Sequence, residues 1–71
     1  YVDDAGITAA VKAKMTEDPV VSAAAISVET LNNTVQLSGF AKSQAEKDRA
    51  ESIARNTQHV REVRNSIVVR P

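Results

Sequence analysis

Apolar and polar residues alternate through residues 26–40, and the alternation breaks at Asn32 and Asn33. Asparagine tolerates the positive φ angles of a two-residue hairpin turn. A loop of that length sets the cross-strand pairs, among them Val28 with Leu37 and Ile26 with Gly39. This register puts four apolar side chains on one face: Ile26, Val28, Val35 and Leu37. A slip of one residue would divide them between opposite faces, so the pattern predicts a β-hairpin in this register.

Apolar residues recur at helical spacing on both sides of the hairpin. Before it, three large apolar residues lie four positions apart and define one helix face: Ile7, Val11 and Met15. Asp3 or Asp4 can cap this helix. Pro19 disfavours the helical conformation at Asp18, so we expect the helix to end there.

A second helix and a third strand follow the hairpin. Ser43 and Glu46 have the spacing of a capping box, in which each side chain accepts a hydrogen bond from the other residue's backbone N–H. An inward stripe at helical spacing comes next: Ala50, Ile53, Ala54 and Thr57. Alternation then returns through residues 63–70 and predicts the last strand.

The order αββαβ predicts an α+β fold, a two-layer sandwich with two helices packed on one face of a three-stranded mixed sheet. A right-handed crossover through the second helix sets the last strand parallel to the second strand. Gly39 then lies in the central strand, where a missing side chain lets a helix approach closely.

Composition limits the classes of function. The chain has 71 residues, enough for one small domain, and it has no cysteine for a disulfide or a thiolate site. Its formal net charge is zero, but residues 1–40 hold two basic and five acidic side chains, whereas residues 41–71 hold seven basic and four acidic ones. The two parts therefore carry charges of −3 and +3.

Several short motifs follow one another along the chain. They are Ile26-Ser27-Val28, the Asn32-Asn33 turn, Val35-Gln36-Leu37-Ser38-Gly39, Ile53-Ala54, and Val60-Arg61-Glu62-Val63-Arg64-Asn65-Ser66-Ile67-Val68-Val69. In this order and spacing they resemble the BON domain, a family named after osmotically inducible periplasmic and nodulation proteins. Two positions depart from the pattern: His59 and Asn33 stand where the family often has glycine. Both residue types enter the left-handed region more readily than most, so the fold is not in doubt.

The resemblance implies an exported protein of the periplasm or cell envelope, often one of stress responses, that binds phospholipid surfaces or partner proteins. No catalytic residue is a property of the family, so none is carried over and no cofactor is implied. We expect residues 1–71 to form a single BON-like domain, excised or processed from a longer exported chain.

Catalysis, metal binding and RNA binding all lack support in the sequence. His59 is the one histidine, and no nucleophile or orienting carboxylate is placed with it. The carboxylates lack the spacing of a zinc or calcium site. RNA-binding modules of this size need a GXXG loop or stacking aromatics, and the chain offers two distant glycines and the rings of Tyr1 and Phe40. We expect no enzyme, no metal and no nucleic-acid partner.

The basic residues near the second helix and third strand are candidates for binding lipid headgroups, each contributing about 1 kcal/mol near an acidic membrane. They are Lys47, Arg49, Arg55, Arg61 and Arg64. Acidic residues are interleaved with them, so a solvated surface is the simpler reading. The predicted structural positions are Gly39, Asn32, Asn33, Ser43 and Glu46. Two functions stay open: association with anionic phospholipid, or a protein-interaction or chaperone-like role with other envelope proteins or neighbouring BON domains.

Overall fold

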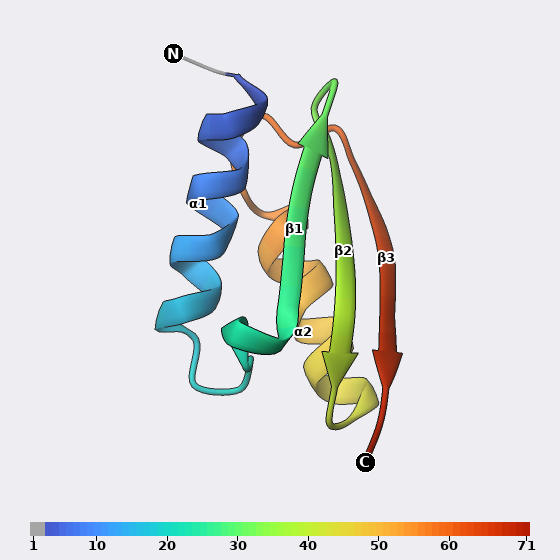
Figure 1. The fold of residues 1–71 in the computed structure, drawn as a ribbon. Coiled ribbons are helices and arrows are strands. Elements are labelled where there is room, and N and C mark those ends of the chain that lie inside the picture. The colour runs from blue at the N-terminus through green and yellow to red at the C-terminus, as the bar shows by residue number, and fades with distance from the viewer. Residues whose placement is uncertain (1–2) are drawn as a thin grey trace.

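The computed structural model describes residues 3–71 and has the predicted order of elements (Figure 1). The elements are α1 (Asp4–Glu17), the short 3-10 helix η1 (Ala23–Ala25), β1 (Ile26–Leu31), β2 (Thr34–Ala41), α2 (Gln44–Arg55) and β3 (Glu62–Val69). The sheet order is β1-β2-β3, with β1 antiparallel and β3 parallel to β2. The predicted α+β sandwich with a mixed three-stranded sheet is confirmed. Tyr1, one of the two aromatic residues considered for stacking on RNA, lies outside the described residues.

The hairpin has the predicted register, with Val28 opposite Leu37 and Ile26 opposite Gly39. Asn32 and Asn33 form the turn with φ angles of 51° and 64°. Both residues therefore occupy the left-handed region, which asparagine enters more readily than most side chains. The two asparagines thus supply the backbone conformation that the turn needs.

The first helix begins and ends where the sequence indicates. Asp3 is its N-cap, and its carboxylate accepts a hydrogen bond from the Gly6 N–H at 2.6 Å. Asp18 is the C-cap, directly before Pro19. Asp4, the alternative cap, instead accepts hydrogen bonds from both hairpin-turn amides, those of Asn32 and Asn33, at 3.0 and 3.2 Å. One carboxylate thus ties the start of α1 to the tip of the hairpin.

The core lies between the helices and one face of the sheet. Its fully buried side chains include Val11, Met15, Val35, Leu37 and Ile67. Along each strand, the alternate residues turn away from this layer and are largely exposed. One sheet face therefore forms the core, and the other is left uncovered.

Gly39 makes a close approach possible, but the neighbour differs from the expected one. A Cβ at this position would collide with the carbonyl oxygen and carbon of Ala25 in η1, not with an atom of α1 or α2. Gly39 also has a φ of +116°, which L-residues rarely adopt. The structural role predicted for Gly39 rests on both facts.

The predicted capping box is only half formed. The Ser43 hydroxyl accepts a hydrogen bond from the Glu46 N–H at 3.1 Å, as a capping box requires. The Glu46 carboxylate does not return to Ser43; it accepts from the Lys42 N–H at 3.1 Å and from the Ser22 N–H at 3.0 Å. The reason is tertiary: the chain before η1 brings an unpaired amide within reach of this side chain, which is only 3% exposed.

Candidate functional site

The structure divides the five candidate headgroup-binding residues between the two layers. Lys47, Arg49 and Arg55 lie on α2, in the helix layer. Arg64 lies on β3 at a position that faces away from the core, and Arg61 directly precedes β3. The five residues therefore do not form one contiguous patch.

Ion pairs further reduce the charge of this set. Three of the arginines contact a carboxylate: Arg49 with Asp18 at 2.7 Å, Arg55 with Glu51 at 2.9 Å, and Arg64 with Glu62 at 3.1 Å. Within residues 3–71, Lys47 and Arg61 take part in no ion pair. Each layer thus offers one basic side chain of the set whose charge is not matched locally.

The uncovered sheet face, which we call the outer face, has its polar and apolar side chains arranged in rows. Strand register aligns its side chains in rows across β1, β2 and β3. From the hairpin end these rows are Leu31-Thr34-Glu62, Glu29-Gln36-Arg64, Ser27-Ser38-Ser66 and Phe40-Val68. A row of hydroxyls therefore separates the hairpin end, where charged side chains lie beside Leu31, from the end formed by Phe40 and Val68.

Large apolar side chains are exposed at both ends of the outer face. Leu31 is 72% exposed beside the turn, and Phe40 and Val68 are 48% and 50% exposed at the opposite end. The Arg70 guanidinium lies over the Phe40 ring at 4.6 Å from its centroid. This distance is within the range of a cation–π contact.

A shallow hollow of about 510 Å³ lies at the hairpin end of the outer face. Arg61 and Arg64 line it together with Leu31 and Glu29. Tertiary structure therefore brings together two of the five predicted basic residues and places an exposed leucine beside them. The sequence did not point to Leu31 as part of the site, although the period-two alternation that buried Val28 already placed Leu31 on the opposite side.

Two carboxylates of the helix layer are held in their ionised form. Hydrogen bonds from the Ser22 and Lys42 backbone amides lower the pKa of Glu46. The Val20 backbone N–H, and then the Arg49 side chain, lower the pKa of Asp18. Both groups hold the chain between α1 and β1 in place, so their chemistry is structural.

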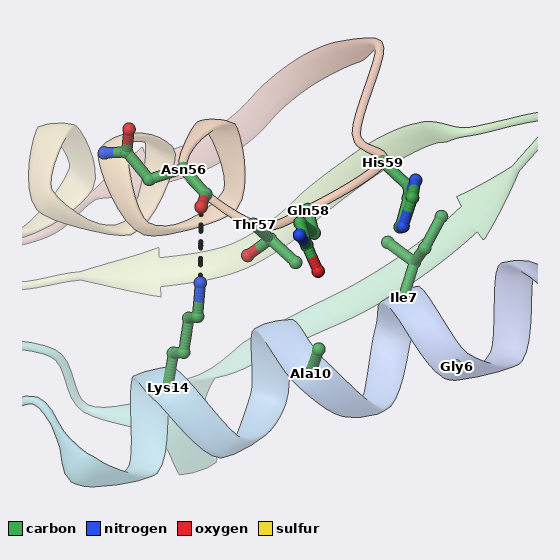
Figure 2. Close-up of a pocket in the computed structure, with 8 residues that line it drawn as sticks. All are labelled: Gly6, Ile7, Ala10, Lys14, Asn56, Thr57, Gln58 and His59. Atoms are coloured by element: carbon green, nitrogen blue, oxygen red, sulfur yellow. Dashed lines mark hydrogen bonds between the residues drawn. The ribbon is translucent and has the colours of Figure 1, made fainter. Parts of the chain in front are cut away.

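A second hollow, of about 380 Å³, lies in the helix layer between α1 and the segment that joins α2 to β3 (Figure 2). We call it the helix-side cleft. It is lined by Gly6, Ile7, Ala10, Lys14, Asn56, Thr57, Gln58 and His59. The Lys14 ammonium group donates a hydrogen bond to the Asn56 carbonyl oxygen across it, at 3.3 Å. His59 has a φ of 72°, in the left-handed region that the sequence analysis anticipated for this residue.

Within residues 3–71, no helix is long and apolar enough to cross a membrane. No group of three or more histidine, aspartate or glutamate side chains in that range is arranged to hold a metal ion.

Comparison with known proteins identifies the family. The family model of the BON domain matches residues 3–71. The chain is also similar to Osmotically-inducible protein Y of Escherichia coli (strain K12), with 43% identity over 67 residues. That alignment covers 94% of this chain and 33% of the relative, so the chain spans about a third of the relative's length. The chain belongs to the BON domain family, and this membership points to a non-enzymatic domain.

Proposed function

We propose that the domain is a non-catalytic module of the periplasm or cell envelope that associates with anionic phospholipid surfaces, in a protein of osmotic or envelope stress. The stress setting and the location are supported by the family resemblance and by the similarity to an osmotically inducible protein. The outer face of the sheet is the surface that we assign to the membrane.

One observation carries this assignment. Of the four large hydrophobic residues exposed within residues 3–71, three lie on the outer face. They are Leu31, Phe40 and Val68. Arginines accompany them at both ends, Arg61 and Arg64 near Leu31 and Arg70 over Phe40.

This combination is what a peripheral membrane surface requires. Apolar side chains enter the boundary between headgroups and acyl chains, while basic groups attract anionic headgroups. Arginine keeps its guanidinium at the headgroups while its methylene stem lies along apolar surface. Helix α2 has basic residues but no exposed large hydrophobic side chain, so it provides only the electrostatic part.

A protein partner is the second candidate, and acidic groups on the outer face favour it. Glu29 and Glu62 lie among the arginines, and Glu62 already neutralises Arg64. These carboxylates would be repelled by an anionic bilayer but would suit a protein surface of mixed charge. A contact dominated by Leu31, Phe40 and Val68 would also be insensitive to salt.

Vesicle co-sedimentation separates the two candidates. Vesicles of phosphatidylglycerol mixed with phosphatidylcholine are compared with pure phosphatidylcholine at increasing salt. We expect binding only to the anionic vesicles, with a loss as salt screens the charges. The double variant Arg61→Glu, Arg64→Glu should abolish sedimentation, whereas the matched variant Lys47→Glu, Arg55→Glu should retain it.

The opposite pattern would overturn the choice of face. If the α2 pair abolishes binding and the outer-face pair does not, the membrane surface is α2. If the unaltered domain fails to sediment with anionic vesicles even at low salt, the protein-interaction function replaces the phospholipid one. Thermal unfolding of both double variants checks that the fold is intact, since exposed ion pairs contribute only about 1 kcal/mol or less.

A further inference from the structure

The lining of the helix-side cleft has a simple distribution of charge. Lys14 is the one formally charged side chain among its lining residues, and no carboxylate lines it. The remaining polar side chains of the lining are carboxamides, a hydroxyl and an imidazole. The local charge is therefore +1, which complements a ligand with a single negative charge.

Several donors in the cleft have unused capacity. Lys14 donates one hydrogen bond, to the Asn56 carbonyl, and an ammonium group has three N–H donors. Within the described residues, the side chains of Gln58 and His59 make no hydrogen bond. Figure 2 shows Lys14 at one end of the cleft, His59 at the other, and the Gln58 side chain between them above Ala10.

The wall that α1 contributes is small and apolar. Gly6 and Ala10 leave space, and Ile7 provides a hydrocarbon surface beside His59 (Figure 2). No phenylalanine, tyrosine or tryptophan ring lines the cleft, so a quaternary ammonium group would find neither a strong cation–π partner nor a carboxylate. Cations and zwitterions are thereby disfavoured, and a short hydrocarbon part is accommodated.

The position of His59 is set by the backbone around it. Its φ of 72° is uncommon for a residue with a side chain, and the Asn33 side chain donates to the His59 carbonyl oxygen at 2.9 Å. The BON pattern often has glycine at this place. The imidazole at this place therefore stands where glycine would offer no side chain, and the hairpin turn holds the backbone that carries it.

We propose that the helix-side cleft binds a small organic acid with one carboxylate, of the 2-hydroxy acid class. The carboxylate pairs with Lys14, the hydroxyl hydrogen-bonds to Gln58 or His59, and the short hydrocarbon part rests on Ile7 and Ala10. A phosphate monoester, which carries close to two charges at neutral pH, is a poorer match for one lysine without an arginine or a set of converging backbone amides.

NMR titration of the ¹⁵N-labelled domain with sodium lactate tests this site, with sodium chloride held to constant ionic strength. We expect saturable shifts with millimolar midpoints, confined to the amides of α1 and residues 56–59. Lactamide, which has the same shape without the charge, and inorganic phosphate should each bind at least about fivefold more weakly; fivefold corresponds to about 1 kcal/mol.

Matched variants locate the binding. Lys14→Met keeps the aliphatic stem and should weaken lactate binding about fivefold, the value of one exposed charge contact of about 1 kcal/mol. Lys12→Met is the control, because Lys12 lies on the same helix but lines a different hollow. Ala10→Leu should fill the cleft and abolish the shifts, whereas Ala13→Leu, on the exposed side of α1, should leave them unchanged.

Three results would overturn the proposal. They are shifts that grow linearly without saturation, equal shifts with lactamide, and an equal loss in Lys12→Met and Lys14→Met. If Ala10→Leu does not fold, as judged by the dispersion of its NMR spectrum, Lys14→Met alone decides. The outer-face variant Arg61→Glu, Arg64→Glu should bind lactate normally. The test of the lactate site is therefore independent of the test of the membrane surface.

Discussion

The two faces of the sheet are built from the same three strands, yet they obey different constraints. On the inner face Val35 and Leu37 have no exposed surface, and they pack against both the helices and their strand neighbours. On the outer face the intervening residues, such as Gln36 and Phe40, are exposed. Because side chains alternate with a period of two, one residue of β2 must pack in the core while the next faces solvent.

The difference shows which face of the sheet contributes most to stability and which face tolerates substitution. Removing buried apolar volume costs several kcal/mol, while exposed substitutions usually change the free energy of unfolding by about 0.5 kcal/mol or less. The outer face can therefore leave Leu31, Phe40 and Val68 exposed, because substitutions there have little effect on stability.

Gly39→Ala should cause a large loss of stability, about 2–4 kcal/mol, because the new methyl group meets the Ala25 carbonyl and the φ of +116° is strained for alanine. Gly6→Ala is the matched control. That glycine is inside α1, where the added Cβ meets only the Asp3 side chain at 3.0 Å, so alanine should be neutral or stabilising by up to about 1 kcal/mol. Chemical denaturation measures both, and equal midpoints would contradict the account of Gly39.

Glu46→Gln should cost about 2 kcal/mol near neutral pH. Its two oxygens accept from different amides, Ser22 and Lys42, and a carboxamide can accept only one of these bonds while turning its NH₂ group toward the other donor. The pKa of Glu46 is lowered in the folded state, so the stability it contributes is present above its ordinary pKa and is lost as the pH falls through the lowered value.

The pH dependence is the sharper test of Glu46. The unaltered domain should lose stability steeply below about pH 4, while the glutamine variant should show a shallower decline over the same range. Some decline remains, because the pKa of Asp18 is lowered as well. Parallel curves for the two proteins would show that Glu46 is not held as a carboxylate by these amides.

Asp4→Ala should cost about 1 kcal/mol, because the amides of Asn32 and Asn33 lose a charged acceptor and must turn to water. Asp48→Ala is the control, since Asp48 is exposed on α2 and its side chain, within residues 3–71, hydrogen-bonds only to that of Gln44. Hydrogen exchange of the turn amides should accelerate in the first variant alone. Unchanged exchange there would mean that the asparagines hold the turn without Asp4.

Phe40→Ala should have the smallest effect on folding, less than about 1 kcal/mol, since the ring is 48% exposed and its clearest contact is with Arg70. Leu37→Ala, three residues earlier on the inner face, should cost about 2–5 kcal/mol. Thermal unfolding compares them. Phe40→Ala should nevertheless weaken sedimentation with anionic vesicles, and similar melting losses in the two variants would contradict the division between faces.

The elements that could be predicted from sequence are those set by local rules. Asn32 and Asn33 specify a turn, and the turn length together with the apolar alternation leaves one acceptable register for the hairpin. Pro19 ends α1 because its ring disfavours a helical conformation at Asp18. These outcomes depend on residues within a few positions of one another, so no long-range information is needed.

The candidate site was harder to predict from the sequence, because the charge of a residue says little about which surface of the fold it occupies. Arg55 and Arg61 are six residues apart in the sequence but belong to opposite layers of the sandwich. Leu31 and Arg64 are far apart in sequence but line the same hollow. Only the crossover from α2 to β3 decides which basic residues share a surface with exposed hydrophobic ones.

The sequence by itself determined the order αββαβ, the hairpin register and the face that each strand residue takes, because turn chemistry and periodicity act locally. The tertiary structure alone decided the partners. It directed Glu46 to Ser22 instead of Ser43, placed Ala25 against Gly39 and joined Asp4 to the hairpin tip. Each of these contacts joins segments brought together by packing of the apolar core, and no local pattern encodes how closely two such segments approach.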